Sequence, residues 1–268
     1  MAIIPLNEQF RTTVSAVDLT NKGSSLQQYM NNIFTMQDID DTVNSAFEFL
    51  DEGNGDGIVI KNRPAANFGN VGLDAVDLSI SDEVSTTYGA TGKWSVAAGR
   101  NVTASAINAV AIGQNSIASA DNSAALFGVA TASNAIAIGT FEIGGALGFR
   151  SLAISESAYA FGQDAIAIGY RTVADATSST AIGERALARA ANATSIGADS
   201  QSDFANATAI GGATTTAINQ IALGSVHTVL ITALASSTSY ADDAAAAAGG
   251  VLVGELYRDG SIVKIRVA

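Results

Sequence analysis

Short runs of small apolar residues recur along the middle of the chain, and each run is followed at once by a small residue. Examples are the runs at 109–112 (AVAI), 166–168 (IAI) and 208–210 (TAI). The residues that follow the runs are Gly99, Gly113, Gly128, Gly139, Ser155, Gly169, Gly183, Gly197, Gly211 and Gly224. Their spacings are 14, 15, 11, 16, 14, 14, 14, 14 and 13 residues. A period of 14 predicts one coil of two short strands joined by tight turns, because it is too short for a pair of helices.

Each run predicts which side chains share a face of its strand. Side chains alternate along a strand, so the first and third residues point the same way. The third residue is Ile in seven of the ten runs, which predicts a buried ladder at that position. The middle residue is Ala in eight runs, which predicts close approach to another backbone or another copy. The nine glycines are predicted structural corners of the repeat, where glycine permits positive φ or tight packing.

The other half of each coil also carries small residues, as in 172–176 (TVADA) and 186–190 (ALARA). Ala at alternate positions predicts a thin interior with little room for bulky groups. Ten coils stacked about 4.8 Å apart give a rod on the order of 50 Å long. So slender a rod buries little alone, and we expect it to associate with other copies. The stretch Thr140–Gly148 is predicted to be an insertion, because it lies between the irregular spacings.

The residues before the repeat predict three segments. Residues 1–23 have no sustained period and predict an extended attachment arm. Residues 24–57 predict a helical stalk, because apolar residues follow steps of three and four. These residues are Leu26, Met30, Ile33, Met36, Ile39, Val43, Ala46 and Leu50. The helix is either a short trimeric coiled coil or an amphipathic helix packed on a neighbour. Residues 58–94 predict a small β adaptor with strands at 58–60 and 76–80.

The repeat domain spans 95–225, and residues 226–268 form the predicted C-terminal segment. Residues 228–232 (TVLIT) predict a strand, and residues 242–248 predict an Ala-rich helical turn. Strands at 251–256 and 261–267 predict a hairpin around Asp259-Gly260, which is a strong hairpin signal. The predicted fold class is therefore mainly β: an intertwined, repetitive parallel β-roll between a helical stalk and a hairpin.

Composition and charge exclude some classes of binding partner. The chain has 268 residues, a formal net charge of −12 and no cysteine. A polyanion repels phosphate backbones, so we expect no nucleic-acid partner. No run of 18 apolar residues occurs, so we expect no membrane insertion by a helix. The first residues lack the features of a secretory signal peptide, which predicts synthesis in a host cytoplasm and display by assembly onto a particle.

Candidate chemistry is sparse, and we expect no enzyme activity, metal or cofactor. His227 is the only histidine, so a two-His metal site or a triad would need other copies. Carboxylates do not recur at a fixed coil position, which disfavours glycosidase chemistry. Residues 52–57 (EGNGDG) partly resemble a calcium loop, but Arg63 stands where the twelfth-position acid belongs. A turn is the preferred interpretation of that segment.

The pattern Ala-Ile-Gly-x-x-Ser/Ala-x-Ala-x-Ala-x-Asn-Ala/Ser resembles the head repeats of trimeric autotransporter adhesins. The best matches run from Ala167-Ile168-Gly169 to Ala209-Ile210-Gly211, and the resemblance covers residues 95–225. It implies a left-handed parallel β-roll, an intertwined homotrimer and a surface that binds host ligands. The C-terminal stretch from Asp242 is similar to the endings of tailed-phage structural and fibre proteins.

Together these observations predict a homotrimeric phage head or tail fibre on the virion surface. It would bind other virion proteins through residues 1–23 and a host surface glycan or protein. The alternatives are a cell-surface bacterial adhesin, a polysaccharide-cleaving spike and an ice-binding solenoid. Only Thr180, Thr194 and Thr208 align for the last of these. The Thr140–Gly148 stretch and the coil corners are the candidate receptor contacts, because loops on rigid scaffolds often bind; otherwise they only cover the interface.

Overall fold

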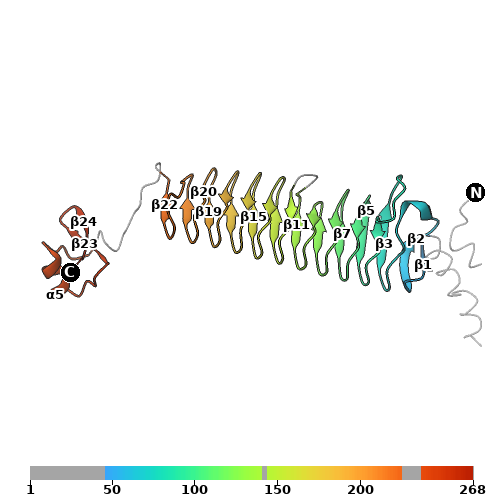
Figure 1. Cartoon of the computed structure of the whole chain (residues 1–268), viewed down its shortest axis with the longest axis horizontal. Helices are drawn as coiled ribbons and strands as arrows, with labels where there is room; N and C mark the ends of the chain where they lie inside the picture. Colours follow the sequence, from blue (N-terminus) through green and yellow to red (C-terminus); the bar gives the residue numbers. More distant parts are fainter. Residues whose placement is uncertain (1–45, 141–143, 225–236, 268) are drawn as a thin grey trace, which may run out of the picture.

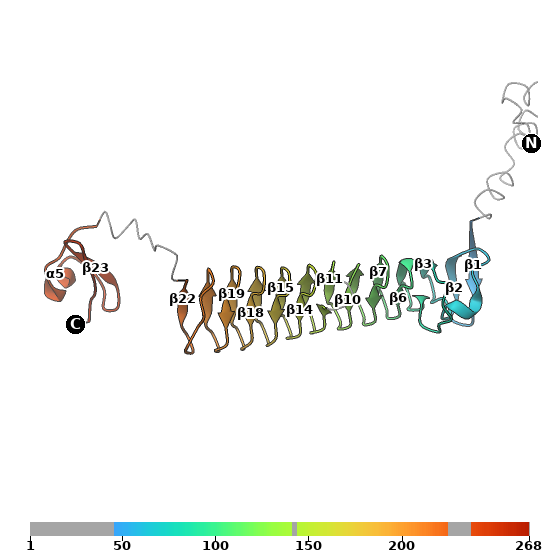
Figure 2. The ribbon, with the colours of Figure 1, turned by 90° about the horizontal axis from the view of Figure 1, so that it is seen from above.

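The structure is a computed structural model that describes residues 46–140, 144–224 and 237–267. Residues 47–224 form a rod of stacked coils, coloured from blue to orange along the sequence (Figure 1). Most coils contribute one strand to each of two sheets, which lie on opposite sides of the rod (Figure 2). The chain therefore folds as a parallel β-solenoid, and the predicted mainly β class is confirmed.

The longer sheet, sheet A, has 13 strands, of which all but β1 run parallel. Its strands, in spatial order, are β1 (Phe47–Asp51), β2 (Asp56–Ile60), β3 (Val76–Ile80), β5 (Val96–Arg100), β7 (Val110–Ile112), β9 (Ala124–Leu126), β11 (Ile136–Ile138), β13 (Leu152–Ile154), β15 (Ile166–Ile168), β17 (Thr180–Ile182), β19 (Thr194–Ile196), β21 (Thr208–Ile210) and β22 (Ile221–Leu223). The strands β2 and β3 continue the ladder into β5 without a break at the expected boundary between 94 and 95.

The shorter sheet, sheet B, has nine parallel strands, each two residues long. They are β4 (Gly89–Ala90), β6 (Thr103–Ala104), β8 (Ile117–Ala118), β10 (Val129–Ala130), β12 (Gly145–Ala146), β14 (Tyr159–Ala160), β16 (Val173–Ala174), β18 (Leu187–Ala188) and β20 (Gln201–Ser202). A short 3-10 helix, η1 (Ala65–Asn67), lies in the loop between β2 and β3. Backbone bonds between successive coils hold both sheets, as in the 2.9 Å bond from Val96 N to the Ala109 oxygen.

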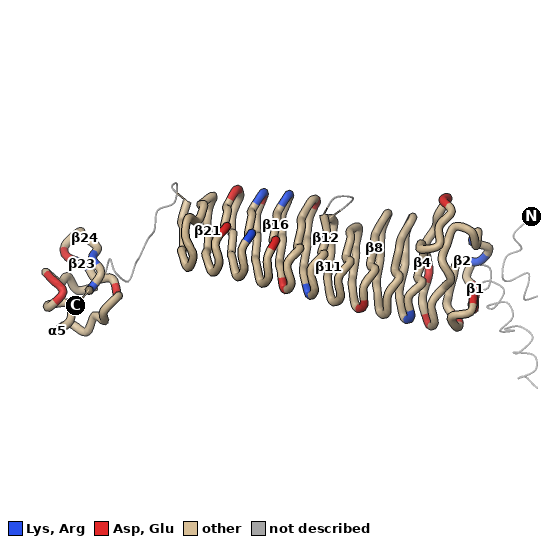
Figure 3. Tube along the Cα trace, in the orientation of Figure 1, with Lys and Arg blue, Asp and Glu red and all other residues tan. Residues whose placement is uncertain are grey.

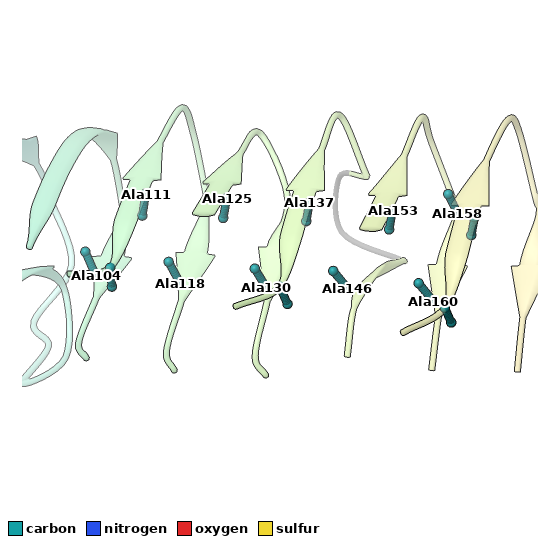
Figure 4. Close-up of a cluster of buried hydrophobic side chains, with 14 of the residues drawn as sticks. Ala104, Ala111, Ala118, Ala125, Ala130, Ala137, Ala146, Ala153, Ala158 and Ala160 are labelled. Atoms are coloured by element: carbon teal, nitrogen blue, oxygen red, sulfur yellow. The ribbon is translucent and has the colours of Figure 1, made fainter. Parts of the chain in front are cut away.

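The interior of the roll is a stack of methyl groups. From β7 to β21 the middle residue of each sheet A strand is buried, as is the second residue of each sheet B strand; Ala111 and Ala118 are examples (Figure 4). The predicted buried Ile ladder is wrong for the single coil: Ile112 and its equivalents point out of the roll. Strands this short bring the two sheets so close that only Ala, Ser and a few Thr or Val side chains fit between them. The prediction of a thin interior is confirmed.

Each regular coil places two non-glycine residues in the left-handed region, one at each corner. At the corner that leads into sheet A these residues include Asn108, Asn122, Asn192 and Asn206, with φ of 56° to 57°. Asn tolerates this region better than most residues because its short side chain bonds locally. Among the corner glycines after the sheet A runs, Gly99, Gly113, Gly139, Gly169, Gly183, Gly197 and Gly211 have positive φ. Gly128 differs, since Phe127 takes φ 51° in that coil.

The N-terminal end of the described chain is an antiparallel hairpin. Residues 47–51, the last part of the predicted stalk helix, form β1 and pair with β2 from Phe47 opposite Ile60 to Asp51 opposite Asp56. The helix prediction is wrong there, because pairing at the sheet edge overrides local helical spacing. The Asp51 carboxylate accepts hydrogen bonds from Gly53 N (2.8 Å) and Gly55 N (3.0 Å), which fixes the turn. Residues 52–57 of the predicted stalk form the turn and the start of β2, and residues 1–45 lie outside the described residues.

Residues 237–267 form a C-terminal module. The helix α5 (Asp243–Ala248) begins at Asp242, whose side chain accepts a hydrogen bond from Ala245 N. The strands β23 (Leu256–Asp259) and β24 (Ile262–Ile265) pair antiparallel across a turn at Gly260. The strand β24 is shorter than the one expected at 261–267, and the strand expected at 251–256 is misplaced, because β23 shares only Leu256 with it. The strand expected at 228–232 lies outside the described residues.

Candidate functional site

From β7 to β22 the outer face of sheet A is an uncharged and mostly apolar surface, with Thr180, Thr194 and Thr208 among its residues. The first and third residues of each three-residue strand project from it, because the middle one points inward. Six isoleucines on this face, Ile112, Ile136, Ile138, Ile182, Ile196 and Ile210, are between 37% and 42% exposed. From β7 to β22 no Asp, Glu, Lys or Arg lies within a sheet A strand. Nine strands about 4.8 Å apart make this face about 40 Å long, which marks it as an interaction surface.

The outer face of sheet B is different in kind. Its strands present Ile117, Tyr159 and Leu187, but the position two residues further on becomes charged toward the C-terminal end. Asp175 and Arg189 occupy that position, and Arg189 donates a hydrogen bond to Asp203 at 3.1 Å. Charged residues lie mostly at the bends and along this side of the tube (Figure 3). Sheet B is therefore the more water-compatible of the two faces.

The Thr140–Gly148 stretch, a predicted receptor contact, belongs mostly to the regular coil. Gly145 and Ala146 form β12 in register with Tyr159 and Ala160. The extra residues are confined to the corner before Gly145, and residues 141–143 lie outside the described residues. The preceding corner, between β9 and β10, is correspondingly short. The long corner compensates for it, because the Thr140 hydroxyl accepts a hydrogen bond from Val129 N at 3.2 Å.

Two aromatic rings lie beside the long corner on the outer face of sheet B. Tyr159 and Phe161 are stacked, with ring centroids 5.2 Å apart and an interplanar angle of 6°. Gly145, the register partner of Tyr159, places no side chain next to the ring. In the following turn the Arg150 guanidinium lies 4.6 Å from the centroid of the Phe149 ring. This irregular coil brings a long corner and a stacked pair of rings together, and sequence reasoning identified the corner but not the rings.

Ion pairs link corners of successive coils. Arg150 donates to the Asp164 carboxylate, and Arg185 to that of Asp199, in both cases one coil further on. The hydrogen bond from Arg185 lowers the pKa of Asp199, and Arg150 does the same for Asp164. These side chains are well exposed, so the pairs align corners and add little stability.

The candidate metal and catalytic residues do not assemble into a site in the described chain. Glu52, from the calcium-like segment, accepts hydrogen bonds from Arg63 at 3.1 Å and from Val71 N at 2.8 Å. Within residues 46–140, 144–224 and 237–267, no three His, Cys, Asp or Glu side chains group in a way that could hold a metal ion. His227 lies outside these ranges.

The fold defines a class, the parallel β-solenoids built from coils of about 14 residues. Within that class, the YadA head domain repeat matches the chain at residues 90–116, 104–126, 157–186 and 188–214. The chain therefore carries YadA head domain repeats, which confirms the resemblance to adhesin heads. No curated protein matches the chain. Among the described residues, no helix is long and apolar enough to cross a membrane.

Proposed function

We propose that this protein is a homotrimeric structural fibre, displayed on the surface of a phage particle, that mediates or assists attachment to a bacterial host. One observation carries the proposal. A rod with a thin interior of small side chains exposes an uncharged row of mostly branched side chains along sheet A from β7 to β22. Such a row is unfavourable in water, and a parallel arrangement of identical rods covers it with matching rows.

Three copies suit this geometry. Each rod has one apolar and one mixed face, so three rods can place their sheet A faces around a common axis and leave sheet B in water. The match to YadA head repeats and the resemblance to trimeric adhesin heads support the number three. The irregular coil around Tyr159 and Phe161 then lies on the outside, where it is the candidate contact for a host surface glycan or protein.

The location of the fibre on a phage particle is the more specific part of the proposal. It is supported by the similarity of the C-terminal stretch to the endings of tailed-phage proteins. Residues 1–23 would bind other virion proteins, and the fibre would act by binding without catalysis. A cell-surface trimeric adhesin of a bacterium is the alternative, which the YadA head repeats favour equally.

The trimer is tested by sedimentation equilibrium of the full chain and of two matched variants. Ile196→Glu places a carboxylate on the sheet A face, whereas Ile107→Glu changes an equally exposed isoleucine (43% against 41%) at a corner. We expect the wild type and Ile107→Glu each to sediment with a mass three times that of one chain. We expect dissociation for Ile196→Glu, because three charges would meet near the axis. A monomeric wild type refutes the trimer.

The location is tested by electron microscopy of intact particles and host cells with an antibody against residues 95–225. Label on particles supports the fibre and distinguishes head from tail. Label confined to the cell envelope of uninfected bacteria supports the adhesin and overturns the phage role. Release of new reducing ends from purified capsule by the protein would instead indicate a polysaccharide-cleaving spike.

A further inference from the structure

The C-terminal module has one covered and one bare side. Tyr257 and its partner Lys264 face the helix α5: the Tyr257 hydroxyl donates to Asp243 Oδ1 at 2.7 Å, and Lys264 Nζ donates to the Ala241 oxygen at 3.2 Å. The bond to Asp243 raises the pKa of Tyr257 to about 12. This side of the hairpin is therefore tied to the helix by hydrogen bonds.

The opposite side of the hairpin is an exposed apolar stripe, which we call the C-terminal stripe. It consists of Leu256, Val263, Ile265 and Val267, which alternate with residues facing the other way. Val263 and Ile265 are each 55% exposed and Val267 is 75% exposed. In the described part of the chain nothing covers these side chains. Their chemistry is that of a core residue, yet they lie in water.

The module cannot hold itself together by its own core. Of residues 237–267, only Ala246 and Tyr257 are buried. Fixing one residue costs about 1–2 kcal/mol of backbone entropy, and two buried side chains offset only a small part of that. Segments of this size usually need further burial, cross-links or association. The C-terminal stripe is the apolar area that could supply such burial.

We propose that the C-terminal stripes of three copies pack on one another and form a clasp beyond the end of the roll. The inference rests on the proposed trimer, because parallel rolls bring three modules to the same end. Twelve residues separate Gly224 from Ser237 and span at most about 40 Å. This tether holds the modules at an effective concentration in the millimolar range, which favours a copy over any free partner.

The chemistry of the C-terminal stripe also suits identical copies. A residue on a symmetry axis meets itself, so a charge there would be repelled, whereas Val and Ile pack on their own kind. Arg258 points to the same side but its Nη2 donates to the Ser237 oxygen at 2.7 Å. The guanidinium is thus engaged within its own module and leaves the four apolar side chains as the contact.

The absence of cysteine from the chain permits a direct test in the full-length protein. Ile265→Cys places a thiol in the C-terminal stripe, and the matched control Ile262→Cys places one on the other side of the same strand. Ile262 is 58% exposed, close to the 55% of Ile265. After mild oxidation at low chain concentration, we expect Ile265→Cys to give at least a tenfold excess of disulfide-linked dimer over Ile262→Cys on denaturing gels.

A second pair of variants reports on stability. We expect Val263→Glu/Ile265→Glu to lower the temperature at which residues 237–267 lose hydrogen-exchange protection, and Ile262→Glu to leave it unchanged. A wild type that sediments as a trimer but shows no selective cross-link overturns the clasp alone. A monomeric wild type refutes the trimer itself. Protection and cross-linking that are equal for both sides of the hairpin also overturn the clasp.

Discussion

The interior of the roll is filled differently in its middle coils and at its N-terminal end: small apolar side chains fill the first, and a buried ion pair fills the second. One column of inward-pointing residues runs through sheet A, and in the middle it holds Ala97, Ala111 and Ala167. At the N-terminal end the same column holds Asp77, which pairs in register with Ala97. Asp77 is 1% exposed and forms a salt bridge with Arg63, which also bonds Glu52. A methyl stack thus gives way to a buried ion pair.

The difference shows what a repeat requires along its length and at its end. In the middle, each coil is covered by the next, so small side chains suffice, and a buried hydroxyl such as that of Ser195 bonds to a backbone oxygen. At the N-terminal end β3 pairs with β2 over only two residues, and there Arg63 comes in from the loop that includes η1, with its guanidinium 4.7 Å from the Phe68 ring centroid. Terminal repeats commonly need such a polar cap. The buried charges at the N-terminal end are stabilised by their pairing with one another, whereas the middle coils are stabilised by close packing of small side chains.

The largest expected loss of stability comes from placing a buried carboxylate, as found at the N-terminal end, in the middle coils. Ala167→Asp places a carboxylate in the methyl stack without an arginine, so an unpaired charge is buried. We expect a loss of several kcal/mol, enough to unfold the adjacent coils, measured by urea unfolding at fixed chain concentration. Ala167→Ser is the control, because Ser195 occupies the same column and donates to the Leu187 oxygen at 2.7 Å. Equal stability of both variants would contradict a dry interior.

The reverse exchange tests the cap. Asp77→Ala restores the repeat residue but leaves the buried Arg63 without its main partner, and we expect a loss of about 3–5 kcal/mol. The double variant Arg63→Met/Asp77→Ala removes both charges, and we expect it to recover most of that stability. The measurement is the urea midpoint of the three proteins. A double variant no more stable than Asp77→Ala would show that the ion pair is not the source of the loss.

A third test concerns the paired irregular corners. Thr140→Val removes the hydroxyl that accepts from Val129 N, and it leaves a buried N–H without a partner. We expect a loss of about 1–3 kcal/mol, because an unsatisfied buried donor costs its desolvation. Thr140→Ser keeps the hydroxyl and should cost much less. A loss as large for Ser as for Val would assign the effect to packing of the methyl group.

The sequence predicted the repeat correctly, but it predicted wrongly which side chains of each run point into the roll. The 14-residue period and the small side chains define the coils, since both follow from local spacing. The direction of Ile112 and Ala111 did not follow, because alternation tells which residues share a face but not which face is inside. The distance between the two sheets decides which face points inside. This distance depends on how short the strands of both sheets are. Pairing of β1 at the sheet edge was equally invisible to local helical spacing.

The candidate site was predictable in part for the same reason. The irregular spacings located the long corner, since they are a property of the chain alone. The stacked Tyr159 and Phe161 were missed, although their i, i+2 spacing on a strand was a signal for a shared face. The corner asparagines were also missed, and their recurrence every 14 residues before the sheet A runs was the signal. The ion pair of Arg63 with Asp77 joins distant residues and has no sequence pattern.

The smallest expected effect compares the corners themselves. Asn206 has φ 56° and accepts a hydrogen bond from Asn192 at 3.0 Å, whereas at the N-terminal end Trp94 occupies the equivalent corner and donates to Asp74 at 3.2 Å. Asn206→Ala should cost about 1 kcal/mol, because a Cβ without a bonding side chain is strained in the left-handed region. Asn206→Gly removes the strain and the side-chain bonds together, so we expect it to cost less than Ala in urea unfolding. If Gly proves as destabilising as Ala, the stacked amides, and not the backbone conformation, explain the recurrence of Asn at this corner.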